Sequence, residues 1–502
     1  MREPTIAEQF CNDTLTPGQA ALIPKLEAFL KADGMGVFLL KGYAGTGKTF
    51  LMKGVVAYLK ACYRERILLA PTGRAAKVLG TRVGERAGTM HGHLYTPRRD
   101  DLPPEEDFDD FQLVSELTYN GDSLDAVYIV DEASMVSDKA HAESLLQFGS
   151  GRLLADFLHF VSESIGPCRR KIIFVGDVAQ LPPVHMSTSP ALDERYLYDE
   201  FGLRAESHLL SDIVRQAEQS GIMRSALGLR RAIETGRVGM PPIDRTADDV
   251  SEIPACDMAE ACWESMRRRL TKDSVMIAHT NRRVQALNRA FRARLFPGVE
   301  TVTAGDKIMV ILNTRLGGEF ICNGDFGQVV RVGDVETHTV RLQPRAAEGL
   351  LAGPRTVELR FRDVSLRFRA NAGHLFTVSV KILEDELEAD EPPDLTRTLR
   401  ALMIDFVRRH PGLTRGTDAW NDALAIDPYL NAVHVRYGYA VTCHKSQGGE
   451  WETVYVDCAW RGRIASTDYH RWLYTAVTRA KTRLVLSNVP HTAQDDYGYG
   501  RM

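Results

Sequence analysis

The glycine-rich segment from Gly42 to Thr49 carries the clearest chemistry in the sequence. Its pattern, GYAGTGKT, matches a P-loop, in which glycines let backbone N–H groups curl around phosphate oxygens. Lys48 would bring a positive charge to the β and γ phosphates, and the Thr49 hydroxyl would bind Mg²⁺. We expect ATP to be the nucleotide, with contacts from Gly42, Ala44, Gly45, Thr46, Gly47, Lys48 and Thr49.

Two adjacent carboxylates, Asp131 and Glu132, follow the apolar run from Val127 to Val130. At the end of a parallel strand they would lie at the sheet edge beside the P-loop. Asp131 would then hold Mg²⁺ through its water shell, and Glu132 would orient and deprotonate the attacking water. Such a pair alone is usually a solvated surface or a helix start, so the P-loop is what favours the catalytic interpretation.

The elements that would position these residues form two blocks. In the first, short apolar runs alternate with helix-like segments and predict a parallel α/β sheet, with strands near Val37–Leu40, Ile67–Ala70, Val127–Val130 and Ile172–Val175. A second α/β block is indicated by Val275–Ala278, a helix from Asn281, Thr453–Val456, a helix ending near Ala480, and Leu484–Leu486. We therefore expect an α/β fold with several domains.

Two interruptions separate the parts of these blocks. Between about Thr301 and Ala432 short alternating runs such as GQVVRV and VELRF predict an inserted small β-barrel. Within it, the acidic stretch EDELEADEPPD before Leu395 is typical of a solvated loop. A second acidic stretch, from Arg98 to Phe111, precedes LVSELTY and an Asn120-Gly121 turn, which together predict a projecting hairpin.

Composition narrows the class of protein. The 502 residues carry a formal net charge of −4, so any nucleic-acid-binding groove must be local. The eight cysteines include no C-x-x-C pair, which argues against a zinc site and a disulfide framework. No apolar run approaches the roughly 18 residues that a membrane span needs, and the N-terminus lacks a signal-peptide core. We expect a soluble cytoplasmic protein that has no membrane contact.

The string Gly176-Asp177-Val178-Ala179-Gln180-Leu181-Pro182-Pro183-Val184 resembles motif III of superfamily 1 helicases. Further strings follow in that family's order, and the chain resembles the RecD/Dda type (superfamily 1B) over nearly its whole length. They resemble the Q motif at Leu15–Gln19, motif Ia at Ala70–Lys77, the next DNA-contacting motif at Gly88–His91, motif IV at Ile213–Gln216, motif V at Tyr439–Glu450 and motif VI at Tyr474–Lys481.

The resemblance implies roles for individual residues. Gln19 would read the adenine edge, and Glu450 would contribute to nucleotide binding. The Gln180 amide would touch the attacking water and the γ phosphate, while Arg215 and Arg479 would stabilise the transition state from the second block. A further set would contact the phosphates and sugars of a single strand: Thr72, Lys77, His91, Pro182, Thr442, His444, Lys445 and Ser446.

The resemblance also implies an architecture of two RecA-like domains. The first would comprise 1–91 and 120–190, with a hairpin, or pin, inserted at 92–119. The second would comprise 191–300 and 433–502, with an SH3-like barrel inserted at 301–432. Phe111 and Tyr119 would be candidates for the strand-separating wedge, with core packing equally open. The barrel would support the pin or the strand, or only pack on the motor.

These features lead to the hypothesis of an ATP-dependent DNA helicase that moves 5′-to-3′. It would act as a monomer on single strands and single-strand/duplex junctions in DNA replication, recombination or repair, and a replication or recombination protein is a candidate partner. Open alternatives are a superfamily 1 RNA helicase and a DNA-stimulated ATPase subunit that does not unwind alone. Against a loader or signalling NTPase stand Gln180 and Arg479, and against an inactive subunit stands the intact P-loop. No acid cluster beyond Asp131-Glu132 suggests a nuclease.

Overall fold

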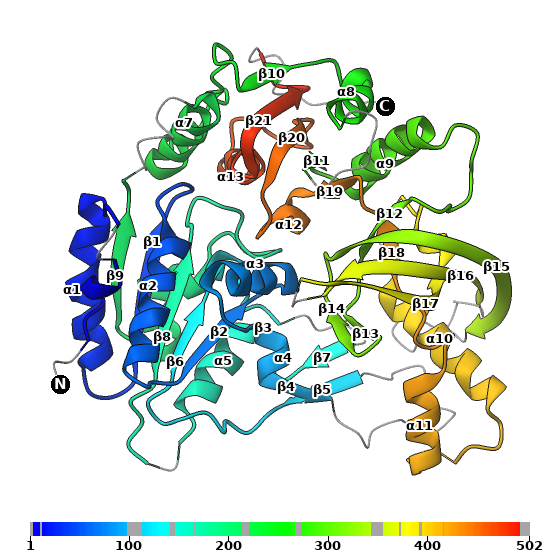
Figure 1. Ribbon diagram of the computed structural model, residues 1–502, viewed down its shortest axis with the longest axis horizontal. Coiled ribbons are helices and arrows are strands. Elements are labelled where there is room, and N and C mark those ends of the chain that lie inside the picture. The colour runs from blue at the N-terminus through cyan, green and yellow to red at the C-terminus, as the bar shows by residue number, and fades with distance from the viewer. Residues whose placement is uncertain are drawn as a thin grey trace.

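The structure is a computed structural model of the chain. It describes residues 4–10, 13–97, 113–140, 146–164, 166–212, 220–266, 273–342, 355–370, 373–390, 394–414 and 416–491. The predictions for Arg215, for Phe111 and for the acidic segment at 98–112 lie outside these residues. Figure 1 shows one sheet with its helices at the lower left, a second sheet above it, and long antiparallel strands at the right.

The first unit is a six-stranded parallel sheet. Its strand order is β3 (Ala87–Thr89), β2 (Arg66–Ala70), β6 (Val127–Val130), β8 (Lys171–Gly176), β1 (Gly36–Gly42) and β9 (Ala205–Leu210). Alternate residues of β1, β2, β6 and β8 are buried on opposite faces, as is expected when helices cover both sides. On β1, Phe38 and Leu40 pack with α1 (Pro17–Lys31) and α2 (Lys48–Ala61), while Val37 and Leu39 pack with α5 (Leu153–Ser162).

The end of the first unit differs from the prediction. Strand β9 pairs in parallel with β1, the strand that leads into the P-loop. Before it, η4 (Pro190–Leu192) and α6 (Glu194–Phe201) pack against the same sheet. The first unit therefore extends past residue 190, where we placed its end, to Leu210. The β9 sequence AESHLL has few apolar residues, since it is an edge strand, and gave little strand signal.

The second unit is a five-stranded parallel sheet. Its order is β10 (Val250–Glu252), β21 (Ala480–Ser487), β20 (Trp451–Asp457), β11 (Ser274–Ala278) and β19 (Ala440–Thr442). Its helices are α7 (Gly221–Thr235), α8 (Met258–Ser265), α9 (Asn281–Leu295), the short α12 (Cys443–Ser446) and α13 (Thr467–Val477). The α/β class and the second block are confirmed.

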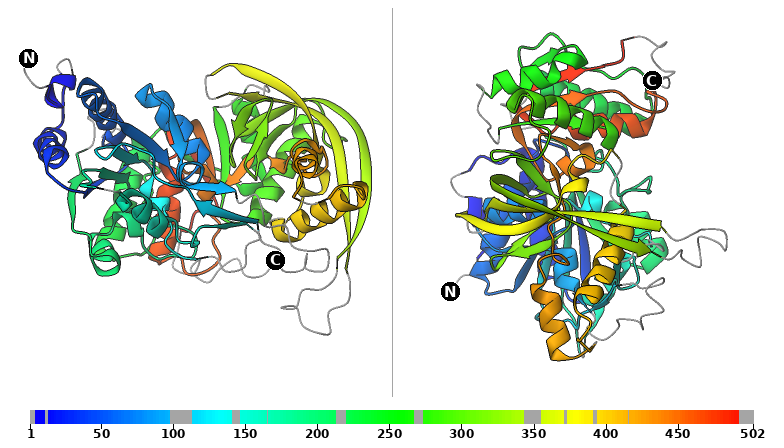
Figure 2. Two further views of the ribbon diagram at one scale, coloured as in Figure 1. Left: turned by 90° about the horizontal axis from the view of Figure 1, so that it is seen from below. Right: turned by 90° about the vertical axis from the view of Figure 1, so that its right-hand side faces the viewer.

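An antiparallel sheet is inserted into the second unit. It has the order β17 (Leu375–Leu383), β16 (Arg355–Arg369), β15 (Phe326–Leu342), β12 (Lys307–Val310) and β18 (Val435–Tyr437). A two-stranded pair, β13 (Thr314–Leu316) and β14 (Glu319–Ile321), lies beside it. Strands β15 and β16 span 17 and 15 residues, far longer than the predicted runs, and curve along their length (Figure 2). Register shifts near Val329 and Val332 mark bulges in β15, which allow such bending.

Two helices within 301–432 were missed by the prediction of an all-β insert. They are α10 (Leu395–Arg409), capped by Asp394, and α11 (Asp418–Ile426), capped by Thr417. Leu402 and Phe406 of α10 are buried, the first against the antiparallel sheet and the second against Trp420 of α11. The residues before these helices alternate with the period of a strand, and the prediction extended that pattern over the helical stretch.

The acidic stretch before Leu395 is solvated only in part, since Glu384 and Glu386 are buried whereas Asp385, Glu388 and Asp390 are exposed. Glu384 lies 2.8 Å from the Arg362 guanidinium, and Glu386 lies 2.9 Å from His434. Both glutamates are buried, in the short 3-10 helix η8 (Glu384–Glu386). Burial of these charges is tolerated because Arg362 of β16 and His434, the residue before β18, supply cationic or hydrogen-bonding partners.

A small sheet projects from the first unit, with the order β4 (Tyr95–Pro97), β5 (Leu113–Leu117) and β7 (Leu146–Phe148). Strands β4 and β5 are antiparallel, as in a hairpin, and the segment that joins them lies outside the described residues. Asn120-Gly121 is not its turn. The buried Asn120 amide instead donates to the Phe160 carbonyl at 2.7 Å and holds the chain where it enters β6.

Candidate nucleotide-binding site

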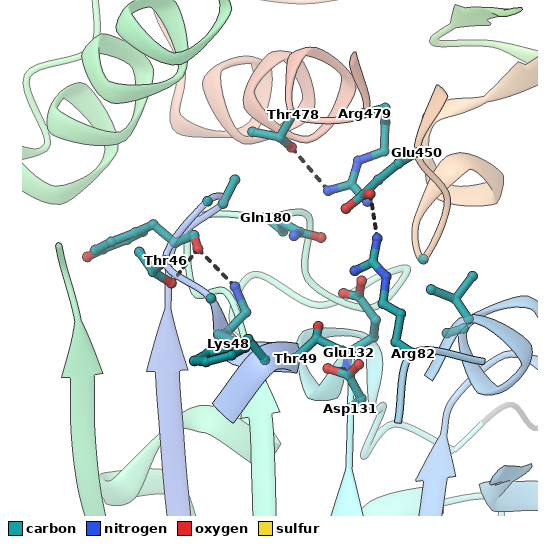
Figure 3. A pocket seen from close by; sticks show the side chains of 18 of the residues that line it. Thr46, Lys48, Thr49, Arg82, Asp131, Glu132, Gln180, Glu450, Thr478 and Arg479 are labelled. Carbon is teal, nitrogen blue, oxygen red and sulfur yellow. Dashed lines mark hydrogen bonds and ion pairs between the residues drawn. The ribbon is translucent and has the colours of Figure 1, made fainter. Parts of the chain in front are cut away.

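A cavity of about 610 Å³ lies between the carboxyl edge of the first sheet and the second unit. Its size is ordinary for a small-molecule site. Ala44–Thr49, Asp131, Glu132 and Gln180 line it from the first unit, and Glu450, Thr478, Arg479 and Lys481 line it from the second (Figure 3). The loops at the ends of β1, β6 and β8 thus converge with helix α13, although they are far apart in the sequence.

The P-loop depends on glycines with left-handed backbones. Gly45 and Gly47 have φ angles of 78° and 79°, which other residues adopt only with strain. A Cβ on Gly47 would also lie 2.6 Å from Nε2 of Gln19. Lys48 begins α2, and its Nζ donates to the carbonyl oxygens of Gly42 and Tyr43 at 2.7 and 3.0 Å. A helix N-terminus and a cation therefore face the cavity, as an anion site requires.

Asp131 and Glu132 lie at the end of β6. The Asp131 carboxylate accepts a hydrogen bond from the Glu132 N–H at 2.9 Å, and Glu132 has a φ of 51°, unusual for a residue other than glycine. Burial raises the pKa of both carboxyl groups, and the positive charge of Lys48 opposes that shift. Arg479 also lowers the pKa of Glu132, which indicates that a cation from the second unit stands close to it.

The residues fit a magnesium ion that arrives with a nucleotide. A hydroxyl, from Thr49, and a carboxylate, from Asp131, line the same cavity and are hard oxygen donors. No cluster of three or more His, Cys, Asp or Glu able to hold a metal occurs among the described residues. Mg²⁺ needs none, because it is usually bound by one or two protein groups together with substrate phosphates.

Gln180 presents an unsatisfied amide to the cavity. The side chain is only 4% exposed, and its Oε1 has no hydrogen-bond partner among the described residues. Its backbone is held from the second unit, since Arg471 of α13 donates to the Gln180 carbonyl at 3.3 Å. A buried acceptor without a partner is costly, so a ligand or water that donates to it would be favoured.

Tyr474 of α13 connects the two units at the P-loop. Its hydroxyl accepts a hydrogen bond from the Ala44 N–H at 3.1 Å and donates to Oδ2 of Asp177 at 2.7 Å. The hydroxyl of the next residue, Thr475, accepts a hydrogen bond from the Leu181 N–H at 2.9 Å. All these groups are buried except Ala44. Tyr474 and Asp177 both lie within the predicted motifs, but no role was predicted for either. Their contact joins residues 297 positions apart in the sequence.

Arg479 reaches the cavity from the loop after α13. Its guanidinium donates to the carbonyl oxygens of Thr475 and Gly449 at 3.0 and 3.3 Å, and to the Thr478 hydroxyl at 3.1 Å. It is 5% exposed, and no carboxylate pairs with it among the described residues. Held by neutral acceptors, the guanidinium keeps its charge available to an anion in the cavity.

Arg82 was missed by sequence reasoning. It lies on α3 (Gly73–Val83), lines the cavity and pairs with the Glu450 carboxylate at 2.5 Å (Figure 3). It also lowers the pKa of Asp131, so it stands near the predicted Mg²⁺ site. Glu450, predicted as a nucleotide contact, is thus engaged with a cation of the first unit. Nothing in the sequence separates Arg82 from an ordinary solvated helix arginine.

Gln19 does not line the cavity. Its Oε1 accepts from the Thr16 N–H at 3.0 Å in a capping box of α1, and its Nε2 donates to the Thr46 carbonyl at 3.0 Å. Gln19 therefore supports the P-loop backbone from below, and the adenine contact stays a prediction. Gly42, likewise outside the lining, contributes its carbonyl to Lys48.

Comparisons with known proteins show which family the chain resembles. A family model described as an AAA domain matches residues 14–240, and one described as a UvrD-like helicase C-terminal domain matches 437–487. Together they contain every described group that lines the phosphate end of the cavity. An ATP-dependent RecD2 DNA helicase of Deinococcus radiodurans is 29% identical over 219 residues, 43% of this chain. The two family models and the RecD2 relative support a superfamily 1B helicase of the RecD type.

The relatives of this helicase-family chain differ in extent. It covers 24% of the length of the RecD2 helicase. An uncharacterised protein of Acanthamoeba polyphaga mimivirus is 20% identical over 92% of this chain and 97% of its own. Among solved structures, Pif1 helicase from Bacteroides in complex with ADP-AlF3 and ssDNA is 15% identical, covers 96% of this chain and 94% of that one, and has a TM-score of 0.45. Pif1 helicase from Candida albicans is 15% identical, covers 97% of this chain and 97% of that one, and has a TM-score of 0.43.

The strand-contact candidates of the first helicase unit are already engaged. Thr72 caps α3 by accepting from the Ala75 N–H at 3.3 Å, and Lys77 pairs with Asp325 of the insert at 2.7 Å. The His91 ring packs against Phe148, with centroids 5.0 Å apart, and burial lowers its pKa. His91 is therefore neutral near pH 7 and offers no positive charge to a phosphate.

The candidates of the helicase's second unit divide into two groups. Thr442, His444 and Lys445 are partly exposed around α12, and burial lowers the pKa of Lys445 to about 8. Ser446 is fully buried, and its hydroxyl donates to the Cys443 carbonyl at 2.7 Å. Pro182, in the loop after β8, is buried as well. The predicted strand contacts of Ser446 and Pro182 are not available in this arrangement.

Gly47→Ala is expected to weaken ATP binding about tenfold to a hundredfold. The new Cβ would strain a left-handed backbone, at about 1–3 kcal/mol, and would press on Gln19. Titration with a fluorescent ATP analogue measures the affinity. Gly84→Ala is the matched control, because Gly84 also has a φ of 79° but meets nothing within 4 Å at the end of α3. Equal affinities of the two variants would contradict the P-loop account.

Proposed function

We propose that this chain is an ATP-driven motor that moves 5′-to-3′ along single-stranded DNA and unwinds duplex DNA. One observation supports the proposal most. The phosphate loop and its two carboxylates lie on the first unit, whereas the Arg479 guanidinium comes from the second. A site divided in this way makes hydrolysis depend on the approach of two sheets, which is what a motor needs.

The proposed chemistry follows from the positions of the groups. A water attacks the γ phosphorus, the bond to the bridging oxygen of ADP breaks, and Glu132 takes the proton of the water. The Gln180 Oε1, which lacks a partner among the described residues, would accept a hydrogen bond from that water. Lys48 and Arg479 would stabilise the charge on the phosphoryl oxygens. Thr49 and Asp131 would hold Mg²⁺, which would neutralise negative charge on the phosphates.

Coupling to movement would run through α13. Tyr474 touches the P-loop and Asp177, and Thr475 holds the Leu181 N–H in the loop that carries Gln180. A change at the γ phosphate would therefore alter how the loop after β8 and helix α13 sit against each other. Closing with ATP and opening after hydrolysis would give alternate grips on the strand.

The proposed strand contacts are those that the structure leaves partly exposed. Thr442, His444 and Lys445 on the second unit would bind phosphates and sugars without reading bases. On the first unit, the proposed strand contacts are Thr72 and His91. Lys77 would also contact the strand, but it would have to exchange Asp325 for a phosphate. This exchange would link strand binding to the contact between the first unit and the insert.

We further propose that the β4–β5 hairpin is the pin and that the antiparallel sheet is the SH3-like insert. The first RecA-like unit would then end near Leu210 rather than 190. The motor would act as a monomer on single-strand/duplex junctions in the cytoplasm, in replication, recombination or repair.

The RecD2 relative, an ATP-dependent DNA helicase, supports DNA over RNA as the substrate. No described helix is long and apolar enough to cross a membrane.

Unwinding of partial duplexes that carry either a 5′ or a 3′ single-stranded tail tests the proposal. With ATP and Mg²⁺ the chain should open only the 5′-tailed DNA, and Lys48→Ala should open neither. Lys48→Ala removes the cation that contacts the β and γ phosphates, so its ATP hydrolysis should fall by about a thousandfold. Opening of only the 3′-tailed DNA would refute the polarity, and opening of only tailed RNA duplexes would refute the substrate.

Single-strand affinity should fall as pH rises through about 8, the pKa that burial gives to Lys445. Below that pH the ammonium is charged and binds a phosphate; above it the contact is lost, at about tenfold in affinity. Anisotropy of a labelled oligothymidine between pH 7 and 9, at fixed ionic strength, measures the effect. Lys445→Arg should remove it, because arginine stays charged. The same pH dependence in both proteins would contradict a Lys445–phosphate contact.

A further inference from the structure

A second cavity, of about 560 Å³, adjoins the nucleotide site. We call it the basic side pocket, because five of its lining residues are cationic: Arg74, Lys77, Arg82, Arg369 and Lys481. Two carboxylates, Asp325 and Glu450, also line it. The first three cations lie on α3 of the first unit, Arg369 ends β16 of the insert, and Lys481 lies on β21. The pocket is thus built where three parts of the molecule meet.

The basic side pocket is continuous with the phosphate end of the nucleotide site. Val78, Arg82, Glu450 and Lys481 line both cavities. The Arg82–Glu450 ion pair stands at the junction, with both side chains partly exposed, and Lys481 lies 4.0 Å from Glu450. Figure 3 shows Arg82 and Glu450 beside Glu132 and Arg479, the groups that face the γ phosphate in our proposal. Charged side chains, and not apolar ones, therefore separate the two cavities.

The pocket holds more positive charge than its own carboxylates satisfy. Asp325 is taken by Lys77 at 2.7 Å. Arg74 lies over the Trp451 ring at 4.2 Å, and its buried Nη1 has no hydrogen-bond partner among the described residues. A guanidinium nitrogen without a partner among these residues is suited to a tetrahedral oxyanion, which accepts several N–H groups at once.

We propose that the basic side pocket is the route by which inorganic phosphate leaves after ATP hydrolysis. This inference rests on the proposed function. Once the bond between the γ phosphorus and the bridging oxygen has broken, the phosphate oxyanion lies among Glu132, Arg479 and Arg82. Arg82 exchanges Glu450 for the phosphate, Lys481 and Arg74 receive it, and Arg369 lies at the exposed end. ADP stays on the P-loop, at the other end of the cavity.

Charge reversal at the outer end tests the route without touching the hydrolysis site. Arg369 is exposed, lines the side pocket and is not among the described residues that line the nucleotide site. In Arg369→Glu, phosphate release should slow by about tenfold, the low end of what a focused field does to the rate of a charged ligand. Hydrolysis itself should stay within about twofold. Single-turnover quench measures hydrolysis, and a fluorescent phosphate sensor measures release in the same mixture.

Arg367→Glu is the matched control. Arg367 lies two residues earlier on β16, is also exposed and is not among the described residues that line the pocket. Its release rate should match the wild type. Unchanged release in Arg369→Glu, or equal slowing in both variants, would overturn the route. So would unchanged release with weakened oligothymidine binding in Arg369→Glu alone, which would assign the pocket to strand phosphates. Absence of hydrolysis in the wild type would instead overturn the proposed function itself.

Discussion

A buried arginine that is held only by neutral groups organises this molecule. Arg479 donates to two carbonyl oxygens and one hydroxyl, and no described carboxylate forms an ion pair with it. A desolvated charge of this kind is unfavourable unless an anion completes it. The anion has to lie in the cavity, where the P-loop of the other unit supplies a second cation and a helix N-terminus. The two parallel sheets are therefore linked through a site that neither contains alone.

The rest of the architecture keeps this divided site in register. Tyr474 and Thr475, one helix turn before Arg479, are hydrogen-bonded to the P-loop and to the loop after β8. Helix α3 contacts the second unit and the insert through three cations. Arg82 pairs with Glu450, Lys77 pairs with Asp325, and Arg74 lies over the Trp451 ring. Polar contacts of this kind can be exchanged for contacts with a ligand at modest cost, whereas an apolar interface of the same size would resist opening. The interface is thus suited to repeated closing and opening.

The sequence predicted the groups at the centre of the site more successfully than their surroundings. Lys48, Asp131, Gln180 and Arg479 line one cavity because each follows a strand or helix whose carboxyl end faces the cleft, a relation that strand order in the chain already implies. Arg82 and the partners of Tyr474 could not be predicted, since their positions depend on contacts hundreds of residues apart. Gln19, Ser446 and Pro182 show the converse, because their motif positions were clear while packing and capping use or bury their side chains.

The kinetics of Arg479→Ala with ATP test the divided site most directly. Because Arg479 acts from the second unit as the cation that completes the transition state, kcat should fall by about a thousandfold or more, the range for removal of an arginine finger. Binding of ATP should change by no more than about tenfold, since the P-loop carries most of the ground-state contacts. A variant with kcat within about tenfold of the wild type would mean that the first unit hydrolyses ATP alone, and would contradict the account.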